Sequence, residues 1–104
     1  AYGIVAIRDG RDLAQRLQAG RLWQRMHLWL TRAGLAAQPM NQLHERADRE
    51  AQLRLAPTFG DAVRSLVGDP SWQGVFTFRL GWPTRPAPAS PRRAVAAVVD
   101  AGID

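Results

Sequence analysis

The sequence predicts an α+β fold, and three stretches of the chain carry this prediction. Residues 2–7 form a short, largely apolar run that fits a buried strand. Residues 12–33 place apolar side chains at the spacing of an amphipathic helix. In residues 72–80, aromatic and aliphatic positions alternate as they do along a strand. With 104 residues the chain is one domain or part of one.

The helix predicted over residues 12–33 begins after a turn, with Asp9 or Asp12 as its cap. Gly20 interrupts it at a cost of about 1 kcal/mol relative to alanine, so Gly20 marks either a junction between two helices or a close approach of another backbone. The predicted buried stripe consists of Leu13, Leu17, Leu22, Met26, Trp29, Leu30 and Ala33. We also expect Trp23 and Trp29 in the core or at an interface, and a structural role for His27.

The second half of the chain predicts two more helices and an extended segment. Residues 43–55 indicate a polar helix, and residues 59–67 a short amphipathic one. The apolar stripe of the latter consists of Phe59, Ala62, Val63, Leu66 and Val67. Residues 81–91 are rich in proline and predict an ordered coil or extended arm. Residues 95–99 predict a short closing helix or strand.

The composition argues against several kinds of site. The absence of cysteine excludes disulfides, thiolate metal sites and cysteine nucleophiles. His44 has no second histidine at ligand spacing, so we expect no metal site, and no serine stands in a nucleophile elbow. No apolar run reaches the roughly eighteen residues of a membrane span. We therefore predict no catalytic side chain and no membrane partner, with a cytoplasmic location as the default.

The net charge of +5 comes from 14 basic residues, all of them arginine. Arginine binds phosphates in a bidentate manner, so a nucleic-acid surface is one interpretation. Most of these arginines are scattered along the chain, however, and no nucleic-acid motif accompanies them. We therefore expect no nucleic-acid partner. The alternative of an arginine-rich binder would be supported by binding that weakens steeply with salt.

The segment most able to carry function lies where the long helix ends. Gly34 offers a left-handed stop to the helix. Pro39 then stiffens the chain and removes one backbone donor. The residues that follow, Met40, Asn41 and Gln42, form a polar turn with backbone N–H groups. Such a turn can lie against the polar edge of a flat heterocycle.

This arrangement resembles the FMN-dependent nitroreductase family, in its Acg-like branch, where a helix ending in Gly-Leu leads to a Pro-x-polar turn at the isoalloxazine ring. Residues 76–83, Phe-Thr-Phe-Arg-Leu-Gly-Trp-Pro, resemble the family's late strand ending in Gly-aromatic-Pro. Residues 90–95, Ser-Pro-Arg-Arg-Ala-Val, resemble the basic tail segment that reaches the FMN phosphate. The resemblance implies that residues 1–104 are the C-terminal portion of a nitroreductase-like domain, with an antiparallel sheet packed on a long central helix.

The resemblance also implies a set of FMN-binding residues. The turn at residues 39–42 would contact the ring, chiefly through its main chain. Asn41 and Gln42 stand where many members have Glu-Gly, so a carboxylate is missing here. Arg92 and Arg93 would bind the phosphate through charge-assisted hydrogen bonds. Many relatives have a basic residue two positions before the match of Arg93, where this chain has Pro91; Arg93 is therefore the stronger candidate, with Arg85 in reserve.

The implied function of the parent protein is reduction of nitro compounds, quinones or similar small-molecule acceptors by FMN, with NAD(P)H as electron donor. A second hypothesis is a non-catalytic nitroreductase-like module for flavin binding, flavin storage or dimerisation. The family's arginine- and serine-rich N-terminal segment and several strands have no counterpart in these residues. We therefore expect the isolated chain to be inactive and to bind FMN poorly. The expected partner is a second copy in a homodimer, or the missing N-terminal half of the domain.

Overall fold

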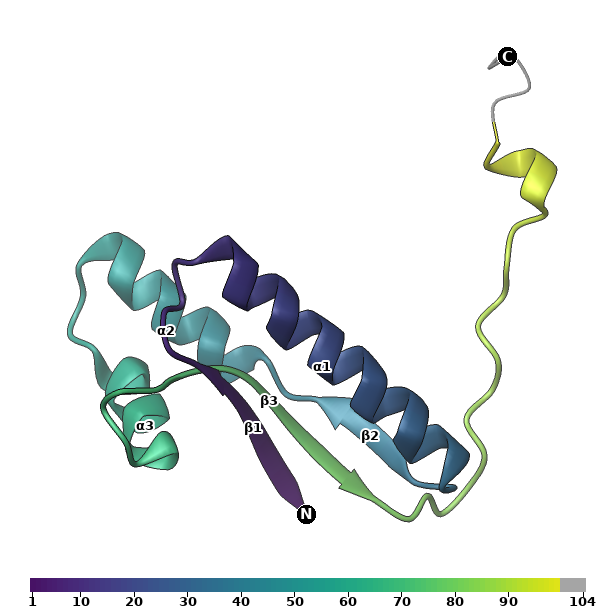
Figure 1. The fold of residues 1–104 in the computed structure, drawn as a ribbon, viewed down its shortest axis with the longest axis horizontal. Helices are drawn as coiled ribbons and strands as arrows, with labels where there is room; N and C mark the ends of the chain where they lie inside the picture. Colours follow the sequence, from purple (N-terminus) through teal and green to yellow (C-terminus); the bar gives the residue numbers. More distant parts are fainter. Residues whose placement is uncertain (100–104) are drawn as a thin grey trace.

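The computed structural model describes residues 1–99, in which a sheet carries one long helix on one face and two shorter helices on the other (Figure 1). In chain order the elements are β1 (Tyr2–Ile7), α1 (Leu13–Arg32), β2 (Ala36–Pro39), α2 (Gln42–Leu53), α3 (Thr58–Val67), β3 (Gln73–Gly81) and the 3-10 turn η1 (Val95–Ala97). The α+β expectation is therefore confirmed. The helices and the two expected strands lie within a few residues of their predicted ranges.

The sheet has the strand order β1-β3-β2, and both outer strands pair antiparallel with β3. No sequence pattern indicated β2, since only a helix stop and a turn were expected between residues 34 and 42. This strand is four residues long and pairs Ala37 with Leu80 and Pro39 with Phe78. Its sequence, Ala-Ala-Gln-Pro, holds none of the β-branched or aromatic residues that favour strands. Pairing with β3 therefore decides its conformation.

Both ends of α1 follow from local chemistry. Asp12 is the N-cap, and its carboxylate accepts the Ala14 N–H at 2.9 Å. The helix stops at Gly34, whose φ of 80° is the left-handed conformation that glycine adopts most easily. The chain then turns directly into β2. The predicted cap and stop are both confirmed.

The buried face of α1 differs from the predicted stripe. Leu30 is buried and Trp23 and Met26 are half-buried, whereas Leu13 and Leu17 are 70% and 71% exposed. The Trp23 ring explains the difference, because it lies 4.6 Å from the ring of Phe76 and so fixes which side of the helix meets the sheet. The predicted stripe is also wrong at Leu22 and Ala33, which are exposed. Trp29 is exposed as well and so does not belong to the core of this chain.

Gly20 marks neither of the features that the sequence suggested. Helix α1 runs through it without a break, and a Cβ built at this position would meet no atom within 4 Å. Packing does require a glycine at Gly3 on β1. A Cβ at Gly3 would collide with the ring of Phe78 on the neighbouring strand. That ring, 5.0 Å from Trp23, belongs to the core between α1 and the sheet.

Helices α2 and α3 form one unit on the opposite face of the sheet. Glu50, which is buried near the end of α2, caps the start of α3 by accepting the N–H of Phe59 at 2.8 Å and of Gly60 at 3.1 Å. Val63 of α3 is buried close to Gly74 of β3. The predicted stripe of α3 holds at Val63 but is wrong at Ala62 and Leu66, which are exposed.

The chain has far more surface than a compact domain of its mass. Its accessible surface is 8950 Å², against about 5,800 Å² expected for a folded monomer of 11.5 kDa. Its radius of gyration is 17.6 Å, against about 13 Å expected. Part of the difference comes from residues 82–94, here called the arm, which leave β3 and run away from the helices and the sheet (Figure 1). Apolar side chains that stay exposed on the folded part, such as Leu13, Leu17 and Trp29, add to it.

Candidate functional site

The candidate ring-binding turn lies between β2 and α2. Pro39 is the last residue of β2, and Gln42 is the first of α2. Between them the Met40 N–H donates to the Thr77 carbonyl oxygen at 2.7 Å. The turn is therefore anchored to the central strand through Met40, and this N–H is occupied by the fold.

Donors for a ligand come instead from the start of α2. Asn41 occupies the N-cap position but makes no side-chain capping hydrogen bond. The first N–H groups of a helix have no acceptor within that helix, so those that follow Asn41 lack a partner within α2. The Asn41 Oδ1 atom is itself buried and has no hydrogen-bond partner. An uncapped helix start favours electron-rich or anionic oxygen atoms, and Oδ1 adds an acceptor beside it.

His44 fixes the first turn of α2 against the sheet. Its side chain is buried, and its Nε2 lies 2.6 Å from the hydroxyl oxygen of Thr77. Burial lowers the pKa of His44 from its ordinary value of 6.5, and the negative charge of Asp48 opposes that shift without cancelling it. No local sequence pattern indicated this contact, because Thr77 lies 33 residues away on another element.

A positive charge lies beside the turn on the same face of the sheet. Arg79 of β3 faces Gln38 of β2, and its Nε donates to Gln38 Oε1 at 2.7 Å. Sequence reasoning missed Arg79 as a candidate because it missed β2. Because Arg79 pairs with Gln38, its guanidinium group is held next to the residue that precedes Pro39 on β2. A negatively charged group bound at the turn would experience this charge.

The candidate phosphate-binding residues lie elsewhere. Arg92 and Arg93 are exposed and lie near the far end of the arm, which Figure 1 shows running away from the sheet and from the turn between β2 and α2. Within one chain the structure therefore does not bring them to the turn. Arg85 lies on the arm as well, where it lines a shallow hollow together with Pro86, Ala87 and Pro88.

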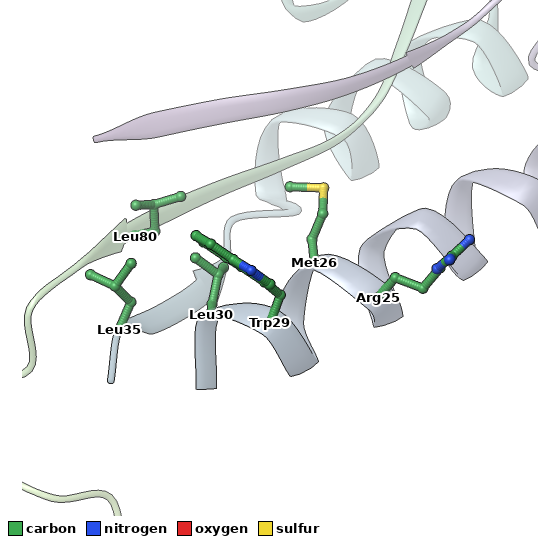
Figure 2. A pocket seen from close by; sticks show the side chains of 6 residues that line it. All are labelled: Arg25, Met26, Trp29, Leu30, Leu35 and Leu80. Carbon is green, nitrogen blue, oxygen red and sulfur yellow. The ribbon is translucent and has the colours of Figure 1, made fainter. Parts of the chain in front are cut away.

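An apolar groove lies between α1 and the sheet, and no sequence signal marked it. Its volume is about 600 Å³, and Figure 2 shows the side chains that line it. The lining residues are Arg25, Met26, Trp29 and Leu30 from α1, Leu35 before β2, and Leu80 of β3. We call this hollow the α1 groove. Its walls are apolar except for Arg25, and Trp29 is 65% exposed within it.

Two classes of site find no counterpart among the residues that the structure describes. No helix of residues 1–99 combines the length and the apolar character that a membrane span requires. In the same residues no three histidine, aspartate or glutamate side chains gather where they could hold a metal ion.

Comparison of the chain with protein-family models, with curated proteins and with solved structures found no significant match.

Proposed function

We propose that this chain is the C-terminal portion of a nitroreductase-like, FMN-dependent oxidoreductase that reduces nitro compounds, quinones or similar acceptors with NAD(P)H. The observation that carries the proposal is the uncapped start of α2 directly after Pro39, with the buried and unpartnered Oδ1 of Asn41 beside it. The order of the three motifs along the chain supports the same conclusion.

The donors and acceptors at the turn fit the polar edge of an isoalloxazine ring. That edge alternates carbonyl oxygens with one N–H group. The free N–H groups at the start of α2 are donors for the oxygens, and Asn41 Oδ1 is an acceptor for the N–H. Asn41 is neutral, whereas a carboxylate at this position would repel the negative charge of a reduced ring.

FMN, when bound, supplies the transfer of hydride, and the chain's part is placement and electrostatics. The main-chain donors at the start of α2 would stabilise negative charge on a bound ring, and the dipole of α2 would act in the same sense. Arg79, held by Gln38, adds a positive charge close by. None of these tasks needs a side-chain nucleophile.

The phosphate contacts require a second piece of protein. Arg92 and Arg93 have the bidentate geometry that suits a phosphate, but the arm carries them away from the turn of their own chain. We infer that they serve an FMN whose ring lies at the turn of another copy, or that the N-terminal half of the domain brings the two parts together. A single isolated chain then offers about half of a binding site.

Titration of the chain with FMN and with riboflavin, followed by flavin fluorescence at low salt, tests the proposal. We expect weak but saturable binding of FMN and weaker binding of riboflavin, which lacks the phosphate. The double variant Arg92→Ala/Arg93→Ala should abolish this difference, whereas Arg11→Ala/Arg16→Ala, with the same loss of charge, should preserve it. Equal affinities for both flavins in the unmodified chain would contradict the phosphate assignment. Tight retention of FMN by the purified chain would contradict the inference that a single chain offers only about half of the binding site.

A second candidate function is a non-catalytic module for flavin binding, flavin storage or dimerisation. The large exposed surface favours it, because a surface of this size is typical of a part that associates with another. An assembled, FMN-loaded protein that oxidises NAD(P)H would establish the first function. A protein that retains FMN without oxidising NAD(P)H would establish the second.

A further inference from the structure

The α1 groove is apolar along most of its length and carries a charge at one end. Figure 2 shows Arg25 at one end of the row of lining side chains, and Leu35 and Leu80 at the other. Met26 and Trp29 lie between these two ends. A ligand that matches this order has one polar end and an apolar body.

The size and the walls of the groove suit a small molecule. Its volume of about 600 Å³ lies within the roughly 300–1,000 Å³ of small-molecule sites. Leu30 is buried, whereas Trp29 beside it is 65% exposed. Water therefore covers a large part of an indole ring in this groove, and an apolar ligand would gain free energy by replacing that water.

The charge at the groove calls for an anion. Helix α1 contains arginine at positions 16, 21, 25 and 32 and no acidic residue. Among the residues that the structure describes, the one ion pair joins Arg64 to Asp61 on α3. The guanidinium of Arg25 thus has no carboxylate partner there. A guanidinium can donate two parallel hydrogen bonds to a carboxylate, which makes this group the matching polar end.

The groove favours a hydrocarbon chain over a peptide. A bound peptide segment would place backbone N–H and C=O groups against the leucines and the indole, which offer them no hydrogen bonds. The groove is also short, because Arg25 and Leu30 are about 7.5 Å apart along the axis of α1. Its length therefore suits a medium chain better than a long one.

We propose that the α1 groove binds a free medium-chain carboxylate, such as decanoate. The carboxylate pairs with Arg25, and the hydrocarbon chain covers Trp29 on its way toward Leu35 and Leu80. Apolar surface removed from water supplies most of the affinity, and the guanidinium supplies the preference for an anion. The site includes none of residues 39–42 and needs no flavin, so it goes beyond the proposed function.

The two methionines of the chain test this site, because Met26 lines the groove and Met40 lies in the turn between β2 and α2. The flavin-free chain, labelled with ¹³C at the methionine methyl groups, is titrated with decanoate below the concentration at which decanoate forms micelles. We expect a saturable shift of the Met26 signal and an unchanged Met40 signal. Addition of FMN should shift Met40 instead, so the two proposals can fail independently.

Ligand series separate the contribution of the chain from that of the charge. Hexanoate should bind at least about tenfold more weakly than decanoate, at about twofold for each methylene that is partly removed from water. Decanol, which has no charge, should bind about fivefold more weakly. Decylammonium, with the opposite charge, should bind more weakly than decanol.

Variants assign these effects to residues. Arg25→Gln should raise the dissociation constant of decanoate about fivefold, to that of decanol, whereas Arg16→Gln, with the same loss of charge on the same helix, should not. Trp29→Gln should raise it about tenfold, and Leu28→Gln, at a residue that is 58% exposed outside the groove, should leave it unchanged. All four residues are exposed, so the variants should remain folded.

Four results would overturn the proposal. One is the absence of a saturable Met26 shift with decanoate. Another is equal loss of affinity in Arg25→Gln and Arg16→Gln. A Met26 signal that shifts on dilution of the protein but not with decanoate would show that a second copy fills the groove. A shift with phosphatidylglycerol vesicles but not with free decanoate would assign the groove to a membrane surface.

Discussion

The Nε2 atom of His44 lies 2.6 Å from the Thr77 hydroxyl oxygen, and the carbonyl of the same threonine accepts the Met40 N–H. One residue of the central strand thus holds both the start of α2 and the turn before it. The candidate ring-binding site is therefore positioned by the sheet and not by the loop alone. Changes at His44 or Thr77 should disturb the turn without touching a ligand.

The stability of the fold should decrease as the pH falls below the ordinary histidine range. Burial lowers the pKa of His44 from 6.5. At mildly acidic pH His44 is therefore protonated in the unfolded chain but less so in the folded chain. This contribution is complete above pH 6.5 and is lost as the pH falls through the folded-state value. Thermal unfolding between pH 7.5 and 5 should show a decreasing Tm.

The histidine variants identify the residue responsible. In His44→Gln the decrease of Tm with falling pH should be smaller than in the unmodified chain, although the variant is less stable at pH 7.5. His27 is exposed, so His27→Gln should retain the full dependence. An unchanged pH profile in His44→Gln would refute this role of burial.

Removing the charge of Glu50 should destabilise the fold through α3. The Glu50 carboxylate accepts hydrogen bonds from the N–H groups of Phe59 and Gly60. Glutamine has only one acceptor oxygen and no charge, so its hydrogen bonds to these two groups are weaker. We expect Glu50→Gln to lower the free energy of unfolding by about 1–2 kcal/mol in urea titrations. The exposed Glu45, in the first turn of the same helix, provides the control, and Glu45→Gln should cost about 0.5 kcal/mol or less. Equal losses in both variants would argue against the cap.

Two glycine-to-alanine substitutions should change stability in opposite directions. A methyl group at Gly3 would collide with the Phe78 ring in the core, so Gly3→Ala should destabilise the chain by about 1–3 kcal/mol. At Gly20 the same group meets open space within a helix, so Gly20→Ala should stabilise by up to about 1 kcal/mol. Urea unfolding of both variants measures this, and a destabilised Gly20→Ala would show that another surface packs closely there.

Much of the fold could be predicted from the sequence because its signals are local. The Asp12 cap, the Gly34 stop and the alternation along β3 each depend on neighbours within a few residues. The strand β2 could not be predicted in this way, because Ala36 to Pro39 extend only by pairing with β3. The His44–Thr77 and Gln38–Arg79 contacts were missed for the same reason, since each joins distant parts of the chain.

The buried face of α1 shows a different limit. Leu13 and Leu17 are aliphatic and four residues apart, so the pattern predicts that they are buried in preference to Trp23. Both leucines are nevertheless exposed. Trp23 packs because its large ring meets the aromatic side chains of β3, which a helix pattern alone does not reveal. An exposed stripe of leucine on a helix is typical of a surface that a second polypeptide covers. The periodicity identified an amphipathic helix but not which apolar side faces its own sheet.

The proposed site can be tested most directly by following the backbone amide signals of the ¹⁵N-labelled chain during addition of FMN. Saturable shifts of Asn41 and Gln42 together with Arg92 and Arg93 are expected, because the ring and the phosphate of one FMN engage both places across an assembled pair of chains. Addition of riboflavin should shift the first two signals but not the arginine pair. Shifts confined to residues outside both places, or no saturable shift at any concentration of FMN, would contradict the flavin assignment.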